Sequence, residues 1–203
     1  MLSWLQRRWP KRRGSLAGER LSLRLDNGRE LWVTRFDAQH AATVASWLRA
    51  PRDSFWAAPR SSYPVQPDDV QEWADHADLA FHAWTPNADA PCAYGEVNNF
   101  RMAVEESWIG HIIVDPVVRG QAVGRAFVHA LVYYAITVLK RQAVSLVVFP
   151  DNVHAIRCYH RAGFRDAGME LKRFPPDTTE HRLLRMVWTP LNAALPPVQY
   201  SPG

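Results

Sequence analysis

The chain has 203 residues, 47% of them apolar, which suits one sizeable domain with a buried core. Its formal net charge is +4, but the excess is local: taking Arg7, Arg8, Lys11, Arg12 and Arg13 from the 24 basic residues leaves 19 against 20 acidic ones. The basicity therefore belongs to an N-terminal arm, and the absence of any apolar run of about 18 residues excludes a predicted membrane span.

The basic arm, residues 1–20, is expected to be flexible and solvated, and contact with RNA, the ribosome or an acidic lipid surface is the alternative. No apolar segment of the kind found in secretory leaders follows it, so we expect a cytoplasmic protein. Cys92 and Cys158 lie far apart and the histidines are scattered, so neither a disulfide framework nor a metal site is predicted.

The first half of the chain after the arm alternates strand and helix signals. Two strands, 21–25 and 29–36, flank the turn residues 26–28 and predict a hairpin. A helix begins at Asp37 and ends before Pro51, because Ala41, Val44, Trp47 and Leu48 share one face. A loop over 51–67 and a short helix over 68–77 follow.

The second half carries three strands, a long helix and a βα unit. We predict strands over 79–84, 92–100 and 107–114, then a buried helix over 121–140, a strand over 143–149 and a helix over 152–162 that Asn152 caps. Two strands, 164–174 and 181–189, close the domain, and the Pro-rich tail is expected to be loose. The predicted organisation is an arm (1–20), one α/β domain (21–190) and a tail (191–203).

The stretch VDPVVRGQAVGRAF, residues 114–127, places glycines and arginines between a strand and a helix. Backbone N–H groups at a helix N-terminus, together with the helix dipole, form an anion site, and phosphate is the usual ligand. Gly120 and Gly124 allow close approach to the backbone, and Arg119 and Arg125 add charge. The pattern is neither GxxxxGK[ST] nor GxGxxG, and an ordinary strand–loop–helix turn is the alternative.

A second pattern, NVHAIRCYHRAGF over 152–164, places polar residues on one face of a helix. Asn152 and Tyr159 are seven residues apart, which is about 10 Å along a helix axis. An extended ligand lying along this face would meet both residues. Capping by Asn152 and packing by Tyr159 are the alternatives.

The two patterns together resemble the GNAT superfamily of acetyl-CoA-dependent N-acetyltransferases. The family signature [QR]-x-x-G-x-[GA] matches 121–126, and N-x-x-A-x-x-x-Y-x-x-x-G-F matches 152–164. Many members have Gly where this chain has Ala122. The resemblance covers residues 107–165 through motifs, and residues 31–106 only through the order of elements. It implies the GNAT fold, an α/β fold of the α+β type with a mixed, mostly antiparallel sheet and helices on both faces.

The resemblance also implies which residues hold acetyl-CoA. The pantetheine arm would lie between two splayed strands and pair with Ile112, Ile113 and Val114. Asn152 would contact the pantetheine, and Tyr159 would lie near the sulfur. The pyrophosphate would take N–H groups from the loop, with help from the last arginine: Arg119, Gly120, Gln121, Ala122, Val123, Gly124 and Arg125.

The implied reaction is direct attack of a primary amine on the thioester, with Tyr159 as general acid. The N–H of Val114 would stabilise the tetrahedral oxyanion. An alkyl ammonium must lose a proton before it attacks, so a base is needed. Glu106 and Glu96 rank ahead of His111, which strand alternation places with Ile109 and opposite Val114.

The acceptor that the resemblance implies is an amine of a small molecule, a protein N-terminus or a lysine. Aromatic and acidic residues of the segments that would shape the groove could hold a cation: Trp47, Phe55, Trp56, Tyr63, Trp73, Asp53, Asp68, Asp69 and Glu72. Packing of the loop is the alternative for the aromatic residues. A non-catalytic acyl-CoA sensor and a ribosome- or RNA-associated protein are the alternative functions, and a homodimer is left open.

Overall fold

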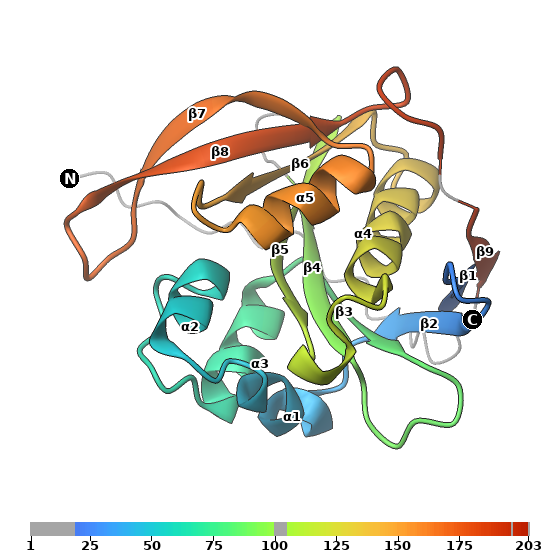
Figure 1. Ribbon diagram of the computed structural model, residues 1–203, viewed down its shortest axis with the longest axis horizontal. Coiled ribbons are helices and arrows are strands. Elements are labelled where there is room, and N and C mark those ends of the chain that lie inside the picture. The colour runs from blue at the N-terminus through green and yellow to red at the C-terminus, as the bar shows by residue number, and fades with distance from the viewer. Residues whose placement is uncertain (1–18, 100–104, 196, 203) are drawn as a thin grey trace.

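The computed structural model describes residues 19–99, 105–195 and 197–202 (Figure 1). The basic arm lies outside these residues except for its last two, so its expected partners stay a prediction. In the part of the chain that is described, no helix is both long enough and apolar enough to cross a bilayer.

One sheet runs through the described chain, with the strand order β7-β8-β6-β5-β4-β3-β2-β1-β9. Neighbouring strands are antiparallel except β5 and β6, which are parallel, so the predicted mixed, mostly antiparallel sheet is confirmed. The strands are β1 (Arg20–Arg24), β2 (Glu30–Arg35), β3 (Leu79–Trp84), β4 (Ala93–Asn99), β5 (Glu106–Val114), β6 (Ala143–Val148), β7 (Arg165–Arg173), β8 (Glu180–Trp188) and β9 (Gln199–Ser201).

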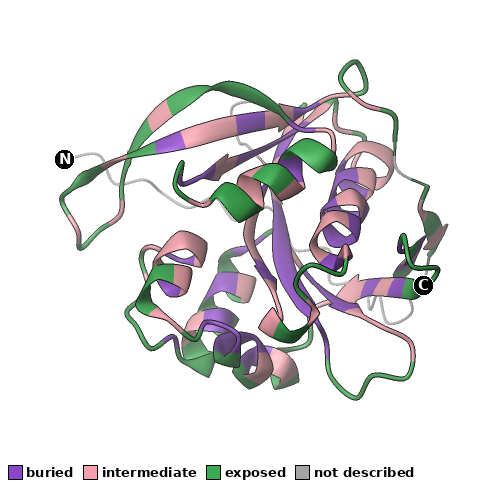
Figure 2. Ribbon diagram, viewed as in Figure 1, coloured by how far each residue is buried: buried purple, intermediate pink, exposed green. Residues whose placement is uncertain are grey.

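Helices cover both faces of the sheet, and each group has its own apolar cluster. The first group, blue to green in Figure 1, consists of η1 (Ala38–His40), α1 (Ala41–Ser46), α2 (Pro51–Ala57) and α3 (Pro67–His76). The second consists of the short η2 (Pro116–Val118), α4 (Val123–Tyr133), its π-helical continuation η3 (Tyr134–Val138) and α5 (Val153–Arg161). Figure 2 shows that the purple, buried residues concentrate on the central strands and the inner sides of these helices.

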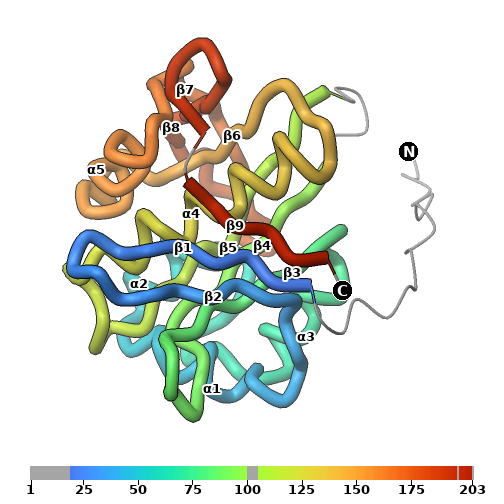
Figure 3. The backbone as a smooth tube through the Cα atoms, turned by 90° about the vertical axis from the view of Figure 1, so that its right-hand side faces the viewer, coloured from blue at the N-terminus to red at the C-terminus, as the bar shows by residue number. Residues whose placement is uncertain are grey.

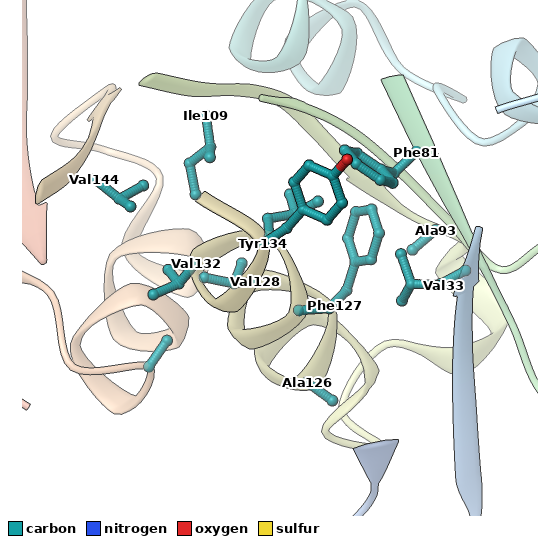
Figure 4. Packing of buried hydrophobic residues seen from close by; sticks show 14 of the residues in the cluster. Val33, Phe81, Ala93, Ile109, Ala126, Phe127, Val128, Val132, Tyr134 and Val144 are labelled. Atoms are coloured by element: carbon teal, nitrogen blue, oxygen red, sulfur yellow. The ribbon is translucent and has the colours of Figure 1, made fainter. Parts of the chain in front are cut away.

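The long helix α4 packs against the middle of the sheet, as the apolar pattern of 121–140 predicts. Phe127 and Leu131 are completely buried there. Figure 4 shows Phe127 of α4 between the sheet residues Phe81 and Val33. A Cβ on Gly95 would lie 2.9 Å from a ring carbon of Phe127, so glycine at this position lets the helix approach β4.

Two predicted segments differ from the structure. The predicted loop 51–67 begins with the helix α2, because Pro51 fits the first helical turn and Asp53 faces the helix dipole. The tail is not loose at 199–201: β9 pairs with β1 at the edge of the sheet, and the Tyr200 hydroxyl donates to Glu19 at 2.7 Å (Figure 3). Apolar–polar alternation over only three residues gave no usable strand signal in the sequence.

Candidate active site

The parallel strands β5 and β6 pair for three residues and then separate. Their register joins 106–108 to 143–145 and ends at Trp108 and Ser145. Beyond that point β5 stays paired with β4 as far as Val114, and β6 stays paired with β8 as far as Val148. In the described chain, the edges of β5 and β6 that face each other are therefore not joined by ladder bonds over their C-terminal halves.

The end of β5 presents its peptide groups to this gap. The N–H of Asp115 donates to the carbonyl of Cys92 at 2.9 Å, so this N–H points toward the β4 side of the strand. Because peptide groups alternate in direction along a strand, the N–H and C=O of Val114 point away from β4 and toward β6. The carbonyl of Val114 accepts from the Arg119 Nε at 3.1 Å on that side. Ile112, two residues earlier in the same extended run, has the same orientation.

The loop between β5 and α4 turns tightly enough to gather its amides. Gly120 has φ of 80° and Ala122, the residue before α4, has φ of 65°, both in the left-handed region. Among the described residues, the backbone N–H groups of 122–125 donate to no protein acceptor. Amides arranged in this way at a helix N-terminus can form an anion site. The predicted set is smaller than expected, because the N–H groups of Arg119 and Gln121 already donate to the carbonyls of Pro116 and Val118, at 3.4 and 3.3 Å.

The side chains of this loop have partners of their own. Arg119 lies 3.5 Å from Asp53 of α2, and the Gln121 side-chain oxygen accepts from Arg29 at 3.4 Å. Arg125 is paired with Asp26 in the β1–β2 turn. In this arrangement Arg125 is held toward the hairpin, so the amides, with Arg119, are the groups that face the gap.

The helix α5 lies beside the start of α4. A Cβ on Gly124 would sit 3.4 Å from Val114 and 3.6 Å from the sulfur of Cys158, so these three residues meet at one point. Burial raises the pKa of the Cys158 thiol to about 11, which keeps it protonated at neutral pH. Asn152 caps α5 by accepting from the Ala155 N–H at 3.2 Å, so its predicted capping role is confirmed.

Tyr159 lies on the buried face of α5, with 9% of its surface exposed. Its ring centroid is 6.1 Å from that of Phe164, within the apolar cluster around α4. Burial raises the pKa of the Tyr159 phenol, because the low-dielectric surroundings disfavour the phenolate. The hydroxyl is therefore protonated throughout the neutral range and can only donate a proton there.

Glu96 on β4, one of the two glutamates predicted as the general base, is almost completely buried. Its carboxylate accepts from the Tyr94 hydroxyl at 2.8 Å and is 2.9 Å from Nδ1 of His111 on β5. The ring of His111 stacks on Trp73 of α3, with centroids 4.8 Å apart. The sequence ranks Glu96 and His111 as competing bases, whereas the structure joins them in one hydrogen-bonded group.

A β-bulge explains where His111 points. Tyr94 pairs with Ile113 but Glu96 pairs with Gly110, so β5 has one extra residue opposite Gly95. His111 adopts φ of 45° within this bulge. The prediction that His111 shares a face with Ile109 is wrong, because the extra residue reverses the alternation: Ile109 packs beside α4 (Figure 4), while His111 faces α3.

Glu106, the other glutamate predicted as the general base, does not lie at this site. It begins β5, eight residues before Val114, which is about 26 Å along a strand. Its carboxylate lies 2.6 Å from Arg185 of β8, so it forms an ion pair between neighbouring parts of the sheet. The predicted catalytic role therefore has no support in its position.

The aromatic residues predicted to line a groove differ in burial: Trp47 and Trp73 are buried, Phe55 and Trp56 are partly buried, and Tyr63 is exposed. Trp47 is buried in the α1–α3 cluster, Phe55 packs on Phe149, and Trp56 donates to Asp151 at 3.1 Å. Tyr63 donates to the carbonyl of Arg49. Trp73, through its contact with His111, is the predicted aromatic residue that reaches the site. Asp69 closes a capping box on α3, which accounts for one of the acids.

The sequence pattern of the acetyltransferase (GNAT) family matches residues 48–164. A spermine/spermidine N(1)-acetyltransferase of Bacillus subtilis (strain 168) is 31% identical over 61 residues. That match covers 30% of this chain and only 40% of the relative, so the chain matches less than half the length of that curated protein.

Solved structures share the fold. The spermidine N-acetyltransferase of Vibrio cholerae, in complex with CoA and spermine, superposes with a TM-score of 0.65 at 16% identity, over 80% of this chain and 96% of that one. An aminoglycoside acetyltransferase, AAC(6')-Ib, in complex with coenzyme A and kanamycin, gives 0.63 at 19% identity, over 80% and 96%. At these identities the likeness shows the fold. Because the family pattern spans more than half of the chain, including both β5 and the loop before α4, the chain belongs to the acetyltransferase (GNAT) family.

Proposed function

We propose that the protein is an N-acetyltransferase that moves an acetyl group from acetyl-CoA to a primary amine. The observation that carries the proposal is the separation of β5 from β6 beside a loop end whose amides, those of 122–125, donate to no protein acceptor among the described residues. The gap accepts an extended chain with amide groups, and the loop accepts a diphosphate. Acetyl-CoA joins these two chemical features in the same order.

In the proposed binding, the residues predicted from the sequence have distinct roles. The diphosphate takes the N–H groups of 122–125, at the end of the loop and in the first turn of α4, and the Arg119 side chain adds charge. The pantetheine amides pair with the peptide groups of Ile112 and Val114, which point into the gap, while Ile113 holds the strand on β4. Asn152 and the buried face of α5 form the opposite wall.

The proposed reaction is direct transfer. The amine nitrogen attacks the thioester carbon, and an N–H at the end of β5 donates to the oxygen that becomes negative. When the C–S bond breaks, the leaving sulfur takes a proton from the Tyr159 hydroxyl, which its burial keeps protonated. The phenolate is then reprotonated from water as the thiol leaves.

For the acceptor we propose a cationic amine. Two proteins similar to this chain are named for spermidine and for aminoglycosides, which both carry several amines. In this chain Asp53 lies at the loop end of α2, where its carboxylate can attract a cation to the gap. Water-exposed positions of Asp68 and Glu72 on α3 extend the negative charge on the same side of the sheet.

The test has two parts. Calorimetry with acetyl-CoA and with CoA should show binding of both, since the diphosphate and the pantetheine arm are common to them. Detection of free thiol with spermine, kanamycin and an alanine-terminated peptide should then show amine-dependent release. Binding without thiol release would identify an acyl-CoA sensor instead, and absence of binding would contradict the proposal as a whole.

A further inference from the structure

The β-bulge in β5 holds one side chain in a conformation that the strand would not otherwise select. His111 has φ of 45°, a left-handed conformation that is uncommon for residues other than glycine and costs free energy. Bulges of this kind commonly re-aim a side chain next to a functional site. Here the extra residue turns the imidazole to the α3 face, while the next residue, Ile112, keeps its peptide groups toward the gap.

Two contacts fix the imidazole. Nδ1 lies 2.9 Å from Glu96, and the ring is nearly parallel to that of Trp73, at 10°. Glu96 in turn accepts from the Tyr94 hydroxyl at 2.8 Å and from the Asn98 amide at 3.4 Å. An ionised carboxylate can only accept hydrogen bonds, so Nδ1 carries the proton in this contact, and Nε2 holds the lone pair.

Burial separates the roles of the two groups. The Glu96 side chain is 3% exposed and lies beneath the histidine, so an acceptor amine has no direct access to its carboxylate. The His111 side chain is 22% exposed. Of the two candidate bases, the imidazole is the one that can touch a substrate.

We propose that His111 is the general base of the transfer and that Glu96 is a positioning residue that fixes its tautomer and orientation. This inference rests on the proposed function and deepens it. As the amine nitrogen bonds to the thioester carbon, Nε2 of His111 takes the proton that the nitrogen loses. The proton passes to water after the C–S bond breaks, so the imidazole is neutral again for the next turnover.

The surroundings favour this protonation change. In the described chain, the ionisable groups in contact with the imidazole or its carboxylate are Glu96 and Tyr94, both on β4, and α3 presents the neutral ring of Trp73. Burial raises the pKa of Tyr94, so its hydroxyl stays protonated. The buried carboxylate is therefore the charge that stabilises the imidazolium formed during the reaction.

The test uses His111→Gly, because glycine accepts the positive φ of this position without strain and leaves room for a small base. With the best acceptor of the three amines, we expect kcat at neutral pH to fall about 100-fold. Added imidazole should restore part of that loss, and the acid limb of the wild-type pH–rate profile should disappear. Affinity for acetyl-CoA should be unchanged, which separates this result from failure of the proposed function.

Two further variants complete the test. Glu96→Gln should lower kcat with intact acetyl-CoA binding, and its pH profile should change while His111 is still present. His154→Gly, an exposed histidine of α5, is the matched control and should not respond to imidazole. A His111→Gly enzyme that binds acetyl-CoA and keeps the wild-type kcat, or one that loses activity but gains nothing from imidazole, would overturn the assignment.

Discussion

The guanidinium of Arg119 lies 3.5 Å from the carboxylate of Asp53 and, through Nε, 3.1 Å from the carbonyl of Val114. One side chain thereby connects the loop before α4, the end of β5 and the first turn of α2. At the other side of the gap, Arg52 of α2 pairs with Asp151 at 2.9 Å, next to the start of α5. The short helix α2 is thus attached to both walls of the proposed acetyl-CoA site.

Removing each partner of the Arg119–Asp53 pair should have opposite effects on binding. Arg119→Ala removes a charged donor to the diphosphate, and we expect a loss of affinity for acetyl-CoA of about tenfold or more. Asp53→Asn frees Arg119 from a competing carboxylate. Because the pair is partly exposed and worth at most about 1 kcal/mol, we expect affinity to rise by up to about fivefold.

Calorimetry of the three proteins checks this prediction, and Arg52→Ala is the control because it breaks the other ion pair of α2 without touching the loop. If Asp53→Asn weakens acetyl-CoA binding, the pair holds the loop in its binding conformation and does not compete with the ligand.

The tight turn of the loop gives a second prediction. Gly120 and Gly28 both have φ of 80°, and a Cβ on either would meet nothing within 4 Å. Alanine at either position therefore costs backbone strain alone, on the order of 1 kcal/mol. We expect similar losses of stability in thermal unfolding, but only Gly120→Ala should also weaken acetyl-CoA binding, since Gly28 lies in the β1–β2 turn. Equal affinities of the two variants for acetyl-CoA would mean that the loop amides do not bind the diphosphate.

The proposed acid can be tested with an almost isosteric change. Tyr159→Phe keeps the ring in its apolar cluster and removes the proton donor, so kcat should fall by about 100-fold while acetyl-CoA affinity stays near wild type. Because burial raises the pKa of Tyr159, the wild-type enzyme should keep its activity well above neutral pH. Steady-state kinetics from pH 7 upward measure both effects. An unaltered kcat would mean that water protonates the leaving thiol.

Much of the fold could be predicted because its signals are local. Strands β3 and β5 and helices α4 and α5 carry clear periodicity or capping residues, and the order of these elements with two motifs identified the family. The loop 119–124 and the cap at Asn152 were located in the same way. What the sequence did not provide was the pairing of side chains across the fold, such as Arg125 with Asp26.

The candidate base, His111, shows why the rest of the site could not be predicted from the sequence. Alternation along β5 assumes a regular strand, and one inserted residue reverses the relation between residues on its two sides, such as Ile109 and His111. The prediction that His111 lies opposite Val114 is met, because Val114 packs against the α4 cluster. The hint in the sequence was Gly110 within the strand, a position where a bulge is common. The burial of Glu96 beneath His111 depends on Trp73 and Tyr94, which come from two other elements, and no spacing rule connects them.

A buried histidine outside the site gives a prediction about stability. His82 of β3 is 4% exposed, its Nδ1 has no hydrogen-bond partner in the described chain, and its ring contacts Trp84 and His40 edge to face. Burial, and then the charge of His40, lowers the pKa of His82 to about 4, although Asp37 opposes the shift. The folded protein therefore keeps this imidazole neutral under conditions in which an unfolded chain protonates it.

The sign of the effect follows from linkage. Above about pH 6.5 the histidine is neutral in both states and has no effect on the free energy of unfolding. As pH falls toward 4, the unfolded state binds a proton at His82 that the folded state does not bind. The free energy of unfolding therefore decreases, by about 2 kcal/mol at pH 5.

Urea unfolding at pH 7.5 and 5.0 should show that loss, and His82→Phe should reduce it, since a phenyl ring keeps the edge-to-face contacts and binds no proton. His154→Gln, which alters an exposed histidine, should leave it unchanged. A loss of the same size in His82→Phe would mean that other groups cause the acid sensitivity and that His82 gains its proton without disturbing the fold.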